Sequence, residues 1–223
     1  MKQKLLTICA AALLFASCSN EKTEGETTSK DSADTKMEKK DESASKEKAA
    51  WIPIDSNMMN KAWQEAMTPG EPHKMMAKSS GTWTGDVTMW MAPDAPPSKS
   101  TSTTVNSMIF NGLYQQSKHT GNMMGMKFEG MSTMAYDNLE KQYVSTWIDN
   151  MGSGILVAKG NWDDATKSLN LTGSMRCANG QDCTMREVFK VIDDNNQVLE
   201  MYGPDPKTGK EFKTMEIKYT RKK

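Results

Sequence analysis

The stretch Gly121–Asn138 reads GNMMGMKFEGMSTMAYDN and decides the fold, because its apolar and polar side chains alternate with a period of two. Successive side chains of a β-strand point to opposite faces. One face then carries the apolar residues Met124, Met126, Phe128, Met134 and Tyr136. The other face carries Lys127, Glu129 and Thr133, with Met131 as an apolar exception. The stretch therefore predicts a strand that turns one face toward an apolar interior.

Methionine is frequent in this stretch, which holds five of the chain's twenty methionines in eighteen positions. A soft-metal site would concentrate thioethers with one or two histidines. The two histidines of the chain, His73 and His119, lie on different segments. We therefore interpret the methionines as interior residues and expect neither a metal nor another cofactor. Walls rich in methionine adapt to varied apolar molecules, so the interior is also suited to a hydrophobic guest.

The same alternation continues on both sides of this stretch, from Gly81 to the end of the chain. About ten alternating segments are separated by short turn sequences, such as NG at 111–112, DNLEK at 137–141 and DDNN at 193–196. A meander of this kind removes its open edges by closing on itself. The sequence thus predicts an all-β fold in residues 81–223, an antiparallel up-and-down β-barrel of about ten strands. A β-sandwich is the alternative.

Residues 51–80 predict a helical preface to the barrel. Apolar residues between Met58 and Met67, including Trp63, recur at helical spacing and form one stripe. Asp55 or Ser56 can cap the start of this short amphipathic helix, and a second helical turn is expected from Pro72 to Lys78. We expect the stripe to pack into the core that follows.

Residues 1–17 have the layout of a secretory signal: Lys2 and Lys4, then a short apolar run that leads to Cys18. The ending LFASC resembles a bacterial lipobox, in which the cysteine is lipidated. A cleaved signal without lipidation is the alternative. By resemblance to lipoprotein sorting rules, Ser19 favours the outer membrane over the inner one. The expected location is the cell envelope, with the membrane as partner through the anchor.

Residues 18–50 follow as a charged segment without an aromatic residue, built mostly from Lys, Glu, Asp, Ser and Thr. Such a composition cannot bury enough apolar surface to become ordered. We interpret it as a disordered tether behind the lipidated Cys18. The whole chain has 28 basic and 28 acidic residues, so no basic field predicts nucleic-acid binding.

Two further cysteines, Cys177 and Cys183, stand in the sequence CANGQDC. In an exported, oxidising setting, the Asn-Gly step between them can bring both sulfurs together across a turn. A local disulfide is the prediction, and free thiols are the alternative.

The phrase GTWTG at 81–85, placed after a helix and before a meander, resembles the G-x-W start of lipocalin and calycin barrels. In those barrels the tryptophan plugs one end and a basic residue late in the chain packs over it. The resemblance implies that Trp83 is a structural plug covered by Arg221 through a cation–π contact. Nitrobindin-like barrels also begin with G-T-W. Their haem is held by a late histidine, which this sequence lacks after His119, and that argues against haem.

Longer phrases extend the resemblance, among them TPGEPHKMM at 68–76, FEGMSTMAYDN at 128–138 and YVSTWIDNMGSGI at 143–155. Together they resemble the secreted bacterial family called domain of unknown function 1579, from about Met58 to Lys222. The resemblance implies a barrel with a short helical preface and no known activity. CANGQDC lies outside the family pattern, so its disulfide would be particular to this chain.

The predicted function is non-catalytic binding of a small hydrophobic or amphipathic ligand in the barrel of a lipid-anchored envelope protein. No G-x-S-x-G, H-E-x-x-H, phosphate-loop or C-x-x-C motif is present, so no enzyme is predicted. One alternative is a structural or interaction lipoprotein with a filled barrel and an envelope protein as partner. Another is an enzyme on a hydrophobic substrate that uses His73 or Asp149 as acid or base. The candidate ligand-binding residues are His73, Tyr114, Met126, Phe128, Tyr136, Trp147, Asp149 and Asn150.

Overall fold

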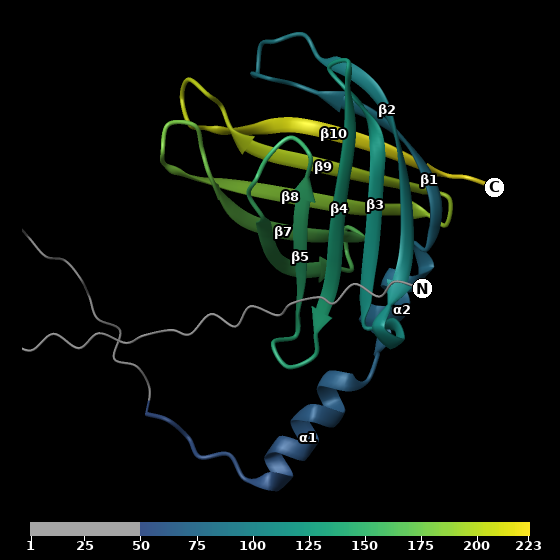
Figure 1. Ribbon diagram of the computed structural model, residues 1–223, viewed down its shortest axis with the longest axis vertical. Coiled ribbons are helices and arrows are strands. Elements are labelled where there is room, and N and C mark those ends of the chain that lie inside the picture. Colours follow the sequence, from purple (N-terminus) through teal and green to yellow (C-terminus); the bar gives the residue numbers. More distant parts are fainter. Residues whose placement is uncertain (1–49) are drawn as a thin grey trace, which may run out of the picture. The chain divides into compact units, whose positions relative to one another are not determined.

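The computed structural model describes residues 50–223. The predicted signal peptide, the lipidation site Cys18 and the predicted tether up to residue 49 lie outside the described residues. Residues 52–223 form one unit, in which two helices precede a barrel (Figure 1). None of the helices in this part of the chain has the length and apolar character needed to cross a membrane.

Ten antiparallel strands form a closed barrel in which each strand pairs with its neighbours in sequence and β1 pairs with β10. The strands are β1 Gly81–Met89, β2 Ser98–Ile109, β3 Tyr114–Met123, β4 Met126–Asp137, β5 Gln142–Asp149, β6 Leu156–Asp163, β7 Ser168–Arg176, β8 Asp182–Asp193, β9 Asn196–Pro204 and β10 Glu211–Arg221. The predicted up-and-down barrel is therefore confirmed, and the β-sandwich alternative is wrong. Closure matters because it leaves no strand edge unpaired.

Tight turns join the strands and set which residues face inward. Between β3 and β4 the turn consists of Met124 and Gly125, whose φ angles of 51° and 82° are both positive. Two residues with positive φ are typical of the type I′ hairpin turn. Met124 was predicted to share the inward face of the strand, but it lies in this exposed turn.

Between residue 50 and the barrel, the chain forms two helices: α1 spans Ser56–Met67 and α2 spans Glu71–Lys78. The carboxylate of Asp55 caps α1 by accepting a hydrogen bond of 2.8 Å from the backbone N–H of Met58. Helix α2 lies against one end of the barrel (Figure 1). There its Met76 joins a core cluster with Tyr143, Ala158, Leu169 and Leu171.

The apolar stripe of α1 stays exposed, contrary to the expectation that it packs into the core. Met58, Met59, Trp63 and Met67 are 42–61% exposed, and α1 has no buried residue. Helix α2, and not α1, lies against one end of the barrel and supplies Met76 to its core. The β4–β5 turn instead holds the last turn of α1, where the Asn138 amide donates to the carbonyl oxygens of Glu65 and Thr68 at 2.8 and 2.9 Å.

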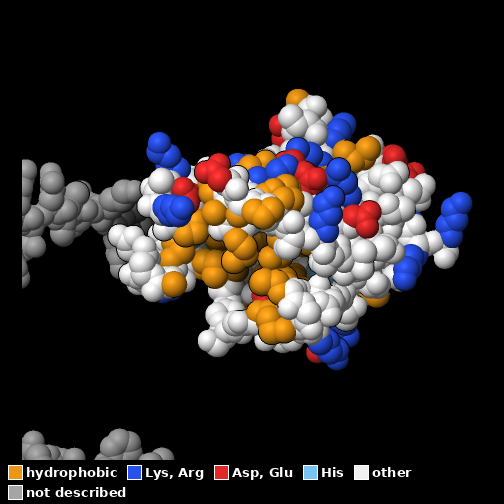
Figure 2. Space-filling view, turned by 90° about the horizontal axis from the view of Figure 1, so that it is seen from above, with side chains coloured by type: hydrophobic (Ala, Val, Ile, Leu, Met, Phe, Trp, Pro, Cys, Tyr) orange, Lys and Arg blue, Asp and Glu red, His pale blue; other side chains and the backbone are white. Residues whose placement is uncertain are grey.

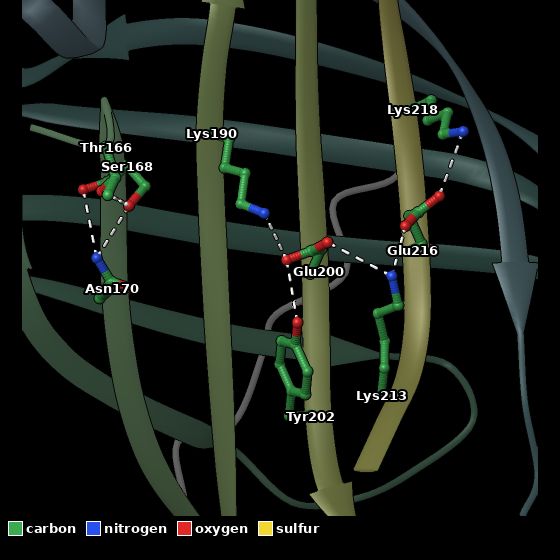
Figure 3. A network of polar contacts seen from close by, with 9 residues as sticks. All are labelled: Thr166, Ser168, Asn170, Lys190, Glu200, Tyr202, Lys213, Glu216 and Lys218. Atoms are coloured by element: carbon green, nitrogen blue, oxygen red, sulfur yellow. Dashed lines mark hydrogen bonds and ion pairs between the residues drawn. The ribbon is translucent and has the colours of Figure 1, made fainter. Parts of the chain in front are cut away.

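The outer face of β8, β9 and β10 carries a row of ion pairs (Figure 3). Glu200 accepts from Lys190 at 2.8 Å, and Lys213 lies between Glu200 and Glu216 at 3.4 and 2.6 Å. The two lysines are 32–37% exposed, whereas the Glu200 side chain is only 14% exposed. The alternate side chains of the same strands, such as Leu199 and Ile217, line the interior of the barrel.

Cys177 and Cys183 form a disulfide across the β7–β8 turn, with 5.7 Å between their Cα atoms. The turn belongs to the barrel end opposite α2, because β7 ends and β8 begins there, as β1 ends and β2 begins. The disulfide therefore ties a turn at the end of the barrel that α2 does not cover.

Candidate functional site

The barrel encloses a cavity of about 500 Å³, to which every strand contributes at least one inward side chain. That volume lies within the 300–1,000 Å³ common for small-molecule sites. Helix α2 covers one end of the barrel, whereas Trp90, Met91 and Met123 line the cavity at the other. Figure 2 shows this open end as a hollow around which hydrophobic side chains gather. The site is therefore a pocket with one closed end and one open end.

Trp83 seals the closed end. Its side chain is 1% exposed, and its indole N–H donates to the carbonyl oxygen of Ser79, at the end of α2, at 2.8 Å. The guanidinium of Arg221 lies 4.2 Å from the ring centroid and donates to the carbonyl oxygens of Ser80 and Lys78 at 2.6 and 2.7 Å. Trp83 in β1 and Arg221 in β10 thus both bind the end of α2, so the first and the last strand of the barrel hold the helical preface.

The wall is largely apolar, and its aromatic part lies on β3, β4 and β5. Trp147 stacks on Phe128 with ring centroids 6.2 Å apart, and the His119 ring meets Trp147 edge-on at 5.0 Å. The Trp147 indole N–H donates to the Asp149 carboxylate at 2.6 Å, which holds the ring in place. The opposite wall is formed by Leu199, Met201, Met215, Ile217 and other inward residues of β9 and β10.

A polar group interrupts this apolar wall midway along the barrel. The Thr104 hydroxyl and His119 Nδ1 share a hydrogen bond of 2.9 Å. His119 Nε2 and the Ser102 hydroxyl are buried without a hydrogen-bond partner in the described part of the chain. Glu187 also lines the cavity. Buried polar groups without partners are costly, so these side chains mark where a ligand would supply hydrogen bonds.

Burial controls the protonation of these groups. It lowers the pKa of His119 to about 4 and that of His73 below its usual value. Burial raises the pKa of Glu187. It also raises the pKa of Tyr219 to about 12, although the hydrogen bond with Thr104 acts to lower the pKa of that phenol. At neutral pH the cavity therefore holds the neutral imidazole of His119, the neutral phenol of Tyr219 and the carboxyl group of Glu187.

Acid should weaken the fold through His119. The unfolded chain takes up a proton near pH 6.5, but the folded chain does so only near pH 4. The free energy of unfolding should therefore fall between these values, by at most about 3 kcal/mol, and His119 should add no further loss below pH 4. Urea titrations of wild type and His119→Gln across pH 4–7 measure this, since the other groups titrate in both proteins. Parallel stability curves in that window would contradict the assignment.

Three of the predicted ligand-binding residues lie in the cavity wall: Phe128, Trp147 and Asp149. Phe128 and Trp147 contribute ring faces. Asp149 stands at the open end, where its carboxylate accepts from the Trp147 indole at 2.6 Å and from the Met151 backbone N–H at 2.8 Å. Its role in the structure is thus to orient Trp147 and the turn after β5.

The other five predicted residues lie outside the cavity wall. Tyr114 is exposed and packs edge-on against Phe110, because the next residue, Gln115, is the inward one. Met126 is exposed where β4 leaves the hairpin turn. Asn150 is exposed and fastens a turn by accepting from the Glu129 backbone N–H and donating to the Lys127 carbonyl.

His73 and Tyr136 belong to the packing around α2. His73 is buried, and its Nδ1 accepts from the Gly70 backbone N–H at 3.0 Å, which caps α2. Its ring meets the ring of Tyr136 edge-on at 6.0 Å. These two residues therefore stabilise the closed end of the barrel and do not reach the cavity.

Sequence reasoning missed Glu187 and Tyr219, and it did not include His119 among the candidate ligand-binding residues. The signal for Glu187 was its place two residues before Phe189, which puts both side chains on the same face of the strand. Because this strand has apolar residues on both faces, the alternation does not show which face points inward. Within residues 50–223, no three His, Cys, Asp or Glu side chains come together as a metal site.

The family model described as "Protein of unknown function (DUF1579)" matches residues 68–221. No curated protein matches the sequence. Among solved structures, the S-type phycobiliprotein lyase CPES from Guillardia theta is similar with a TM-score of 0.51 and 10% identity, over 68% of this chain and 93% of that chain. Rv2717c from M. tuberculosis is similar with a TM-score of 0.51 and 8% identity, over 70% of this chain and all of that chain. At these identities the likeness concerns the fold alone.

Proposed function

We propose that this chain, which belongs to the DUF1579 family, binds a small hydrophobic or amphipathic molecule in its barrel without catalysing a reaction. The observation that carries the proposal is the cavity of about 500 Å³, closed by Trp83 and α2 at one end and open at the other. A barrel that served only as a packed scaffold would fill this space with its own side chains.

The composition of the wall supports binding by burial. Apolar surface removed from water contributes roughly 25 cal/mol per Å², and the methionines Met89, Met201 and Met215 adapt to the shape of a guest. A few polar groups, Thr104 and His119 among them, would orient its polar end.

The enzymatic alternative has less support from the same geometry. His73, one of the two residues considered as acid or base, packs around α2 away from the cavity. The carboxylate of Asp149, the other one, already accepts two hydrogen bonds. The word lyase in the name of one similar structure describes that protein, and its likeness to this chain is one of fold.

Titration of the full chain with the neutral probe N-phenyl-1-naphthylamine tests the proposal. Its fluorescence should rise and saturate at one probe per chain as the naphthyl ring enters the apolar cavity, and decanol should displace it. A probe signal that stays linear, as for unbound dye, would contradict binding in the barrel.

We also propose that Cys18 carries the lipid that holds the protein in the envelope, at the outer membrane. The exposed apolar stripe of α1 supports a membrane-side position. The alternative, an interaction lipoprotein with an envelope protein as partner, would use the same stripe.

Labelling cells with an alkyne-tagged palmitate tests the anchor. Wild type and Cys9→Ser should incorporate the label, since Cys9 lies within the predicted signal peptide. Cys18→Ser should lose at least about nine-tenths of the label, because the thiol that receives the lipid is gone. Equal labelling of Cys18→Ser and wild type would contradict the assignment.

A further inference from the structure

We propose that the ligand is an amphipathic amine whose cationic head pairs with the Glu187 carboxylate inside the barrel. The proposal rests on the proposed function, because it names the chemistry of the molecule bound in the same cavity.

Glu187 occupies an unusual position for a carboxylate. It lies midway along β8, where Leu171 of β7 and Met201 of β9 are its partners in the sheet, and it lines the cavity. Among residues 50–223 its side chain makes no ion pair or hydrogen bond, and burial alone accounts for its raised pKa. A buried carboxylate without a partner is strongly unfavourable. A cation that enters with the ligand would remove this cost.

The described residues supply no cation to Glu187 from the protein itself. Lys78 and Arg221 are the basic side chains that line the cavity, and both belong to the closed end. Arg221 donates there to three backbone carbonyls, those of Lys78, Ser80 and Asp194. His119 is neutral at neutral pH. A cationic ligand in the middle of the cavity therefore meets no cationic side chain of the described residues there, and its charge would favour the ionised form of Glu187.

The surroundings of Glu187 suit an ammonium group. Tyr219 lies near Glu187, and a charge on Glu187 raises the pKa of the Tyr219 phenol. Thr104 connects Tyr219 with His119. When His119 Nδ1 carries the proton and donates to Thr104, Nε2 is a free acceptor. An ammonium group has three donors, and the wall of the same cavity carries the ring faces of Phe128 and Trp147.

The same chemistry selects against fatty acids. A fatty acid would bring a second carboxyl group into a cavity where no basic residue of the described chain lies beside Glu187, so its negative charge would have no counter-charge in a medium of low dielectric constant. A long-chain alcohol would gain burial but no ion pair. Amine, alcohol and acid of equal chain length thus separate the contribution of charge from that of burial.

Displacement of N-phenyl-1-naphthylamine from the full chain by decylamine, decanol and decanoate at neutral pH tests the inference. We expect decylamine to bind at least about tenfold tighter than decanoate, since a charge-assisted hydrogen bond contributes about that much. In Glu187→Gln, decylamine should lose about tenfold in affinity, decanoate should bind better and decanol should change less than about twofold. Glu129→Gln, on the exposed outer face of β4, is the matched control and should behave as wild type.

Each outcome decides the proposal. Decanoate binding as tightly as decylamine, or an unchanged preference in Glu187→Gln, would overturn the amine assignment while the cavity proposal stands. Failure of the probe and all three decyl compounds to bind wild type would overturn the proposed function itself. Glu187→Met, of similar length and without charge, repeats the test if the glutamine variant fails to fold.

Discussion

Trp83→Ala should lower the free energy of unfolding by about 3–5 kcal/mol, the range for truncating a buried tryptophan. The substitution empties the closed end of the barrel, where Trp83 packs with Val87, Ile217 and Tyr219. It also removes the indole N–H that holds the end of α2 and the ring that receives Arg221. Because domains are stable by only about 5–15 kcal/mol, the change should be plain in urea denaturation followed by circular dichroism.

Two variants keep this prediction decisive. Trp83→Phe retains most of the packing and loses the hydrogen bond, so we expect a smaller loss of about 1–2 kcal/mol. Trp63→Ala removes a tryptophan that is 60% exposed on α1 and should change stability by less than about 0.5 kcal/mol. A Trp83→Ala protein as stable as the Trp63→Ala protein would show that Trp83 is no plug.

Ser132→Phe should reduce binding of N-phenyl-1-naphthylamine by at least about a hundredfold while the barrel stays folded. Ser132 lines the cavity on β4 and pairs in the sheet with Trp147. A phenylalanine ring at this position occupies space that the guest needs, and the open cavity limits the overpacking cost to about 1–3 kcal/mol. Fluorescence titration measures the binding, and circular dichroism measures the fold.

Thr133→Phe is the matched control for this variant. Thr133 is the next residue of β4 and lies outside the cavity wall, because successive side chains of a strand face opposite sides. It adds the same ring to the outer surface and should leave probe binding within about twofold of wild type. If both variants lost probe binding equally, the cause would be damage to the strand. If both retained probe binding equally, the probe would bind outside the barrel.

The barrel could be predicted from the sequence because alternation is a local signal that survives in almost every strand. In β4, Phe128 and Met134 face inward as their pattern predicts. The exposed stripe of α1 could not be predicted in the same way. Periodicity shows that a helix has an apolar face, but it does not show what covers that face. Here Met76 of α2 occupies the barrel end instead.

The candidate site could be predicted only in part, because a one-residue shift turns a strand residue to the other face. Tyr114 and Gln115 illustrate this, since the aromatic residue faces out and the amide faces in. Glu187 was hidden by its neighbours, because Val188 and Phe189 are both at least partly buried. The contact of Thr104 with His119 joins residues of two strands, and only the register of β2 and β3 brings them together.

Native mass spectrometry of the full chain, purified gently from the cells that naturally make it, tests the central claim most directly. We predict a retained organic mass in a ratio of one to one, lost from Ser132→Phe and kept in Thr133→Phe. The bare protein mass for wild type, with no uptake of added decylamine or N-phenyl-1-naphthylamine, would contradict a ligand-binding barrel.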